Sequence, residues 1–132
     1  MKTKLAAIGL GVGMLAAIAP VSAHHSFAGT YLEDAPPVKI EGTLKEFLLR
    51  NPHSFVQVED ATLKNPDGTP VRWSIEWGAA GQLAQQGVSG NSLKVGDHVT
   101  VTGSPGRNPA DHRLRMRSIE SSSGFKNSGQ FN

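Results

Sequence analysis

Three histidines, His24, His25 and His53, are the residues of this sequence with the clearest capacity for chemistry. Neutral imidazoles bind transition metals, and nitrogen donors favour copper(II) most strongly among the common divalent ions. If the chain is cut after Ala23, His24 becomes the amino terminus, and its α-amine and imidazole can chelate one metal together. His25 or His53 would then supply a third nitrogen. These histidines are the candidate metal ligands, and copper(II) is the candidate cofactor.

A structural interpretation of the same histidines competes with the metal site. Their spacing matches no closed zinc or copper motif, and the chain has no cysteine. Two histidines at a chain terminus are then solvated, while His53 hydrogen-bonds a turn carbonyl and fixes the corner beside Asn51. We prefer this interpretation and keep the metal site as the alternative.

A second candidate site is a ligand-contacting rim made of Asn51, Trp73, Glu76 and Trp77. The rim is where small β-barrels often place such groups. The two tryptophans share one side of a predicted strand and could form an aromatic platform, although tryptophans at alternate strand positions more often belong to a core. No nucleophile has an identifiable base, and the carboxylates are scattered singly. We therefore expect no catalysis.

These residues have to be positioned by a predicted set of strands. Period-two alternation predicts strands over residues 38–49, 55–60, 71–77, 98–103 and 114–119, and helical spacing predicts one helix over 79–86. The Asn51-Pro52 step forces a corner between the first two strands, which places His53 at a rim. Asn51 is expected to hold this turn by side-chain hydrogen bonding. The predicted order of elements is three strands, one helix and two further strands. A five-stranded OB-type barrel has this order, with its helix between strands three and four. The predicted class is mainly β. Ten apolar residues are expected to form most of the core: Val38, Ile40, Leu44, Val56, Val58, Trp73, Ile75, Leu83, Val99 and Val101.

The domain organisation follows from composition. Residues 1–23 begin with positive charges, continue as an uncharged apolar run, and end in small residues of the kind that precede a signal-peptidase cleavage site. This pattern is typical of a cleaved signal peptide. The apolar run is too short for a comfortable membrane span. We expect an arm over 24–37, the barrel over 38–120 and a flexible tail over 121–132. Export to the periplasm or the medium, with no stable membrane span after cleavage, is the expected localisation.

The charge balance bears on partners. The segment removed contains two of the 13 basic residues and none of the 11 acidic ones, so the remaining 109 residues are formally neutral. Nucleic-acid grooves need excess positive charge, so no nucleic-acid partner is expected. Arg113, Arg115 and Arg117 form one basic stripe, interpreted as a solvated exterior paired with acids. His98 and His112 are interpreted as surface residues.

The chain resembles a family of small exported bacterial proteins of unknown function. The resemblance rests on His24-His25-Ser26-Phe27, Asn51-Pro52-His53, the strand from Trp73 to Trp77, and the run from Leu93 to Gly103. It implies an exported single-domain protein and no established chemistry. The predicted function is therefore a non-catalytic periplasmic binding or interaction module for an unknown ligand or protein, and the alternative is a copper(II)-binding accessory protein.

Overall fold

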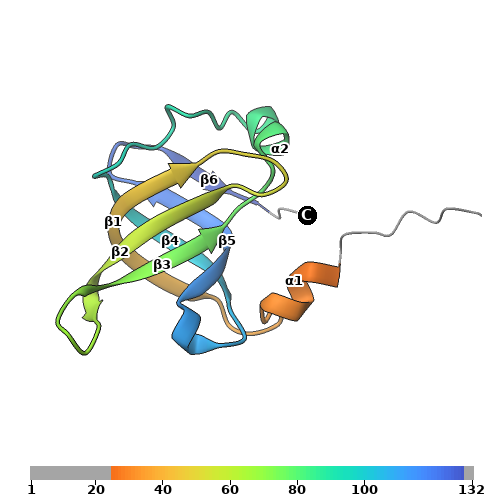
Figure 1. Cartoon of the computed structure of the whole chain (residues 1–132). Coiled ribbons are helices and arrows are strands. Elements are labelled where there is room, and N and C mark those ends of the chain that lie inside the picture. Colours follow the sequence, from red (N-terminus) through yellow and green to blue (C-terminus); the bar gives the residue numbers. More distant parts are fainter. Residues whose placement is uncertain (1–24, 130–132) are drawn as a thin grey trace, which may run out of the picture.

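The computed structural model describes residues 25–129, so the predicted signal peptide and His24 lie outside the described residues. In chain order it contains helix α1 (His25–Thr30), strands β1 (Val38–Leu48), β2 (Phe55–Lys64) and β3 (Pro70–Glu76), helix α2 (Ala80–Gln85), strand β4 (His98–Pro105), a 3-10 turn (Pro109–Asp111), and strands β5 (Arg113–Ser121) and β6 (Lys126–Ser128). The strands wrap into a barrel, with α2 at one end and α1 beside the other (Figure 1). Within the described range, no helix is both long enough and apolar enough to span a membrane.

The barrel is closed by a parallel pair of strands. β1 pairs with β2 on one edge and with β4 on the other, β2 pairs with β3, and β4 pairs with β5, all antiparallel. Residues 74–76 of β3 then pair in parallel with residues 113–115 of β5, which completes the ring β1-β2-β3-β5-β4. This is the OB connectivity, with α2 between the third and fourth strands. The predicted fold class is confirmed.

Two glycines allow the barrel to curve tightly. A Cβ on Gly42 of β1 would lie 1.9 Å from the carbonyl oxygen of Glu59, and one on Gly103 of β4 would lie 2.5 Å from that of Arg115. Both distances are sterically forbidden, so only glycine lets the neighbouring backbones approach this closely. A bulge between Leu44 and Glu46 bends β1 further.

The core follows the predicted alternation with two exceptions. Eight of the ten residues expected in the core are buried: Ile40, Leu44, Val56, Val58, Ile75, Leu83, Val99 and Val101. The other two, Val38 and Trp73, are only partly buried against it, whereas Trp77 is 2% exposed. Tyr31, at 1% exposed, lies in the segment predicted as an arm.

Part of the predicted flexible tail, residues 121–129, is described by the structure. β5 continues to Ser121, and β6 pairs with it through three residue pairs. Phe125 packs against the core, and its carbonyl accepts a hydrogen bond from the Ser121 amide at 2.8 Å. Strand pairing and one apolar side chain thus attach this polar stretch to the barrel.

Candidate binding site at the arm and the corner

The corner, residues 50–54, is held by a buried serine. The Ser54 hydroxyl accepts a hydrogen bond from the Arg50 amide at 3.1 Å and donates one to the Arg50 carbonyl at 3.1 Å. The Ser54 carbonyl also accepts from the Trp77 amide at 2.7 Å, which ties the corner to the end of β3. Asn51 was expected to hold this turn, but its side-chain oxygen only accepts a long bond of 3.4 Å from the Gly81 amide. That expectation is corrected: Ser54 holds the corner, and the Asn51–Pro52 peptide within it is cis.

His53 points from this corner toward Glu76 on the outer face of β3. Its Nδ1 lies 3.4 Å from Glu76 Oε1, and the two side chains are 30% and 13% exposed. The other Glu76 oxygen, Oε2, accepts a hydrogen bond of 2.6 Å from the Tyr31 hydroxyl. Both oxygens of one half-buried carboxylate are therefore engaged, one by the corner and one by the arm.

The arm, residues 25–37, lies across this carboxylate. The Phe27 ring meets the His53 ring edge-on, with centroids 5.1 Å apart, and the Arg115 guanidinium lies over Phe27 at 3.9 Å from the ring centre. Arg115 also forms an ion pair of 2.9 Å with Glu33. We call the set Phe27, Tyr31, His53, Glu76 and Arg115 the junction, because it joins the arm, the corner, β3 and β5.

Tyr31 is the fixed point of the arm. Burial raises the pKa of its phenol well above the usual range, and the hydrogen bond and negative charge of Glu76 raise it further. Arg113 acts in the opposite direction and does not offset these effects. The hydroxyl consequently remains a proton donor to Glu76 at any physiological pH.

Backbone hydrogen bonds fasten the same stretch to the end of β4 and the loop that follows. Tyr31 forms a β-bridge with Gly106, and the Leu32 amide donates to the Pro105 carbonyl at 2.8 Å. The Arg107 amide donates to the Thr30 carbonyl at 2.9 Å. The arm thus bridges the β4–β5 loop and the corner.

The arginines of β5 act on the arm rather than facing solvent alone. Arg117 donates from Nη2 to the Glu33 carbonyl at 2.6 Å and from Nε to the Ser104 hydroxyl at 2.9 Å. Together with the Arg115 ion pair, these bonds make the alternating arginines a clamp for residues 27–33. The sequence analysis recognised the stripe but missed this role. The feature of the sequence that could have indicated this role is the aromatic and acidic composition of the arm.

The two tryptophans of β3 do not form a joint platform. Trp77 is buried in the core, whereas Trp73 is half-buried and donates from Nε1 to Asp60 Oδ2 at 2.9 Å. The His112 ring packs edge-on against Trp73 with centroids 5.1 Å apart. His112 is therefore a packing residue rather than a free surface histidine, and His98 is exposed beside Glu41 at 3.7 Å.

Asp60 is the most heavily hydrogen-bonded carboxylate at the Trp73 end of the barrel. Burial opposes its charge, but hydrogen bonds from the Leu63 and Thr62 amides and the Trp73 indole outweigh burial and lower its pKa. Sequence alone did not indicate this buried acceptor, because Asp60 stood at the end of a predicted strand and a carboxylate there is more often solvated.

The described residues contain part of the candidate metal set. Among residues 25–129, no three His, Cys, Asp or Glu side chains are grouped so that they could hold a metal ion. His53 belongs to the junction, His25 begins α1 with only its backbone described, and His24 lies outside the described residues. The candidate copper ligands therefore stay a prediction.

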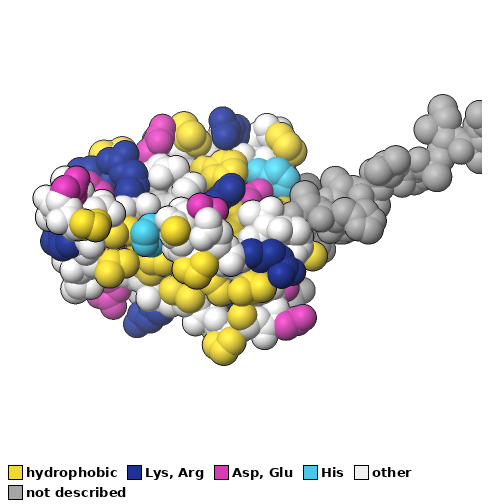
Figure 2. Space-filling model, turned by 60° about the horizontal axis from the view of Figure 1, so that its bottom comes forward, with side chains coloured by type: hydrophobic (Ala, Val, Ile, Leu, Met, Phe, Trp, Pro, Cys, Tyr) yellow, Lys and Arg dark blue, Asp and Glu magenta, His cyan; other side chains and the backbone are white. Residues whose placement is uncertain are grey.

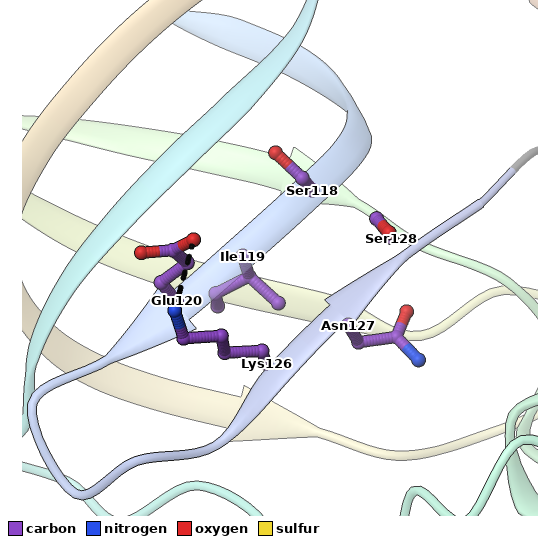
Figure 3. A pocket seen from close by; sticks show the side chains of 6 residues that line it. All are labelled: Ser118, Ile119, Glu120, Lys126, Asn127 and Ser128. Atoms are coloured by element: carbon purple, nitrogen blue, oxygen red, sulfur yellow. Dashed lines mark ion pairs between the residues drawn. The ribbon is translucent and has the colours of Figure 1, made fainter.

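A shallow pocket of about 180 Å³ lies apart from the junction, on β5 and β6. It is lined by Ser118, Ile119, Glu120, Lys126, Asn127 and Ser128 (Figure 3). The Lys126 ammonium and the Glu120 carboxylate pair across it at 3.5 Å. It contains none of the candidate site residues and has few apolar walls, which distinguishes it from a typical small-molecule site.

Fold and junction define a single OB-type barrel domain that holds its own amino-terminal arm on its outer face. The chain belongs to the family of unknown function DUF6152, which matches residues 12–115. A comparison with curated proteins gives no match. The His24–Phe27 start and the Asn51–His53 corner, on which the sequence resemblance rested, stay predictions as family features.

The chain is also similar to two crystal structures of mitochondrial single-stranded DNA binding proteins from S. cerevisiae, Rim1, one of them selenomethionine-labelled. Both are 17% identical to it, and each likeness covers 67% of this chain. The coverage of the yeast chains is 95% and 94%, with TM-scores of 0.49 and 0.48.

The exclusion of nucleic acid made from the sequence is corrected by these likenesses. The similar structures are single-stranded DNA binding proteins, so the expectation of no nucleic-acid partner does not stand. Nucleic acid therefore belongs among the ligands to be tested.

Proposed function

We propose that the protein is an exported, non-catalytic binding module whose ligand surface is the junction. The observation that carries this proposal is the convergence of aromatic, imidazole, carboxylate and guanidinium groups from four separate segments at Glu76. Three of these segments are the corner, β3 and β5, which are fixed by the barrel, and groups held on rigid elements are suited to recognition. Export is supported by the signal-like composition of residues 1–23.

The non-catalytic character is supported by how the reactive groups are engaged. The Ser54 hydroxyl is buried and bonded to the Arg50 backbone at both its donor and its acceptor side. The Glu76 oxygens are occupied by Tyr31 and His53. A nucleophile and a base would need to face each other in an accessible space, and these groups instead stabilise the local fold.

Copper(II) binding by His24, with His25 or His53, is a second candidate function, and the position of His53 favours it. Its Nδ1 faces the Glu76 carboxylate, and metal-binding histidines commonly donate their other ring nitrogen to a carboxylate in this way. Nε2 would then be the ligating atom. Phe27, two residues beyond His25, contacts the His53 ring, which supports a terminal chelate at this place.

Two measurements test the main proposal. Fusion of the full chain to a reporter enzyme that is active only outside the cytoplasm, with mass spectrometry of the purified amino terminus, tests export and cleavage after Ala23. A thermal-shift screen of the exported chain against metals, aromatic compounds, peptides and single-stranded DNA tests binding. A ligand at the junction should lose at least tenfold in affinity with Glu76→Gln and keep it with Glu120→Gln, a matched change on exposed β5. Cytoplasmic retention would overturn export, and equal losses in the two variants would overturn the site.

Copper titration makes the second candidate testable. The chain beginning at His24 should bind copper(II) at least tenfold more tightly than the same chain with one extra residue ahead of His24, because the extra residue removes the chelate of amine and imidazole. Affinity should fall as pH drops through the imidazole range near 6.5, since the ligands must lose protons. Equal affinity of the two forms would refute the terminal chelate, and an unchanged copper spectrum in His53→Ala would return His53 to a structural role.

A further inference from the structure

The contacts of Phe27 differ in kind from those of the rest of the arm. At Thr30–Leu32 the arm is fixed by backbone hydrogen bonds to Pro105 and Arg107 and by the buried Tyr31 side chain. Phe27, one helical turn earlier, is half-exposed, and its recorded contacts to the barrel are ring contacts with His53 and Arg115. The arm thus has a fixed part at Thr30–Leu32 and an earlier part that is held by the Phe27 ring and by one hydrogen bond of 2.8 Å from Arg107 Nε to the Ala28 carbonyl.

Helix α1 has little stability of its own. It spans six residues, contains Gly29, and carries neither an acidic residue in its first turn nor a basic residue in its last. Isolated helices this short do not persist in water, and an interior glycine weakens them further. The conformation of α1 therefore depends on its contacts with the barrel, which are the ring contacts of Phe27 with Arg115 and His53 and a hydrogen bond of 2.8 Å from Arg107 Nε to the Ala28 carbonyl.

The place that Phe27 occupies is built to receive a ring. A guanidinium 3.9 Å from the ring centre provides a cation–π contact on one face, and the His53 imidazole lies at 5.1 Å and 81° in edge-on geometry. Both flanking groups are positioned by carboxylates, Arg115 by Glu33 and His53 by Glu76. Figure 2 shows hydrophobic side chains in a band across the lower part of this face of the molecule, with Lys or Arg and His side chains beside it.

We propose that the gap between the Arg115 guanidinium and the His53 imidazole is a binding site for a planar aromatic group, and that the arm's own Phe27 fills it until a ligand displaces it. The inference rests on the proposed function, because it names the ligand chemistry of the same junction. The ligand replaces one ring by another, α1 unfolds locally, and Tyr31 keeps the remainder of the arm on the barrel. Self-occupation lowers the apparent affinity of the site by the fraction of time for which it is open.

A ligand titration monitored by NMR amide shifts tests the site directly. The probes are N-acetyl-phenylalanine amide and, as a control without a ring, N-acetyl-leucine amide. In Phe27→Ala the phenylalanine probe should bind at least tenfold more tightly than to the unmodified chain and should shift the signals of His53 and Arg115. Adding Arg115→Lys, which keeps the charge facing Glu33 but removes the planar guanidinium, should weaken binding about threefold to tenfold.

Hydrogen exchange on the unmodified chain provides a second test that needs no variant to fold. The Tyr31 amide donates to the Phe27 carbonyl at 2.7 Å within α1, whereas the next amide, Leu32, donates to the Pro105 carbonyl at 2.8 Å. If Phe27 leaves its site by local opening, Tyr31 should exchange at least tenfold faster than Leu32.

The results that overturn the inference are distinct from those that overturn the proposed function. Equal exchange at Tyr31 and Leu32, equal probe affinity in Phe27→Ala and the unmodified chain, or equal affinity for the leucine control would each refute an aromatic site under Phe27. If the thermal-shift screen nevertheless finds a ligand that binds at the junction, the proposed function stands and only the aromatic class of ligand is refuted.

Discussion

Single side chains decide how the two ends of β3 are stabilised. At one end Glu76 accepts from Tyr31 and faces His53, and near the other Asp60 accepts the Trp73 indole and two backbone amides. Both carboxylates are largely buried. Hydrogen-bond donors, rather than one opposite charge, compensate the cost of burying each of them. Their contribution to stability therefore depends on the retention of each donor.

Asp60 predicts a pH dependence of stability with a definite sign. Its folded-state pKa lies below the unfolded value near 3.9, so it contributes stability above that value, and the contribution is lost as pH falls through the folded pKa. Asp60→Asn should reduce the free energy of unfolding by about 1 to 3 kcal/mol at pH 7. Urea unfolding should show this difference shrinking below pH 4.

Asp34→Asn, at an exposed position of the arm, is the control for this prediction and should leave the free energy of unfolding within about 0.5 kcal/mol at each pH. A difference between Asp60→Asn and the unmodified chain that stayed constant from pH 7 to pH 3 would contradict the proposed role of the Asp60 charge.

At the scale of elements, the corner shows what the sequence could and could not reveal. The Asn51-Pro52 step correctly predicted a turn and the position of His53 at its rim, because proline restricts both its own backbone and that of its neighbour. Which side chain holds the turn depends on burial, and burial of Ser54 follows from its contact with β3, more than 20 residues further along the chain. A short polar residue carries no local signal of that contact.

The corner makes a prediction that separates its two polar side chains. Ser54→Ala leaves the Arg50 amide without its buried acceptor and should cost about 1 to 3 kcal/mol. Asn51→Ala removes only the long bond to Gly81 and should cost less than about 1 kcal/mol. Thermal and urea unfolding of the two variants decide the order, and a larger loss for Asn51→Ala would reverse our assignment.

The arm and the end of the chain were harder to predict than the barrel strands for a related reason. The strands are predicted by the alternation of apolar residues, such as Val71 and Ile75 in β3. Arm residues 27–33 attach through the side chains of Phe27 and Tyr31 and through backbone hydrogen bonds, and the ring of Phe125 packs on the core, in each case against distant strands. Such long-range attachment has no periodicity, and so both segments were expected to be extended or mobile.

At the scale of the whole molecule, the core supports a corrected prediction about the tryptophans. Trp77 is 2% exposed and Trp73 is only partly buried, although the sequence analysis assigned Trp73 to the core. Trp77→Ala should therefore be the more damaging change, costing about 3 to 5 kcal/mol. Trp73→Phe keeps much of the packing, removes the donor to Asp60, and should cost about 1 to 3 kcal/mol.

Equilibrium urea unfolding of the two tryptophan variants, followed by circular dichroism, measures this order. A Trp73→Phe loss equal to that of Trp77→Ala would show that the indole–carboxylate bond matters more to the barrel than burial of the larger side chain.

Strand β5 has a consequence for when the molecule can fold. It pairs with β3, β4 and β6, and its arginines hold residues 27–33, so it contacts segments from both ends of the described chain. A chain that emerges amino terminus first has no partner for the free edge of β3, and lacks the arginines that hold the arm, until residues 113–121 arrive. Contacts of such large sequence separation form slowly, because loop closure precedes any stabilisation. The sequence order of this barrel thus postpones its closure until almost all of the polypeptide is free.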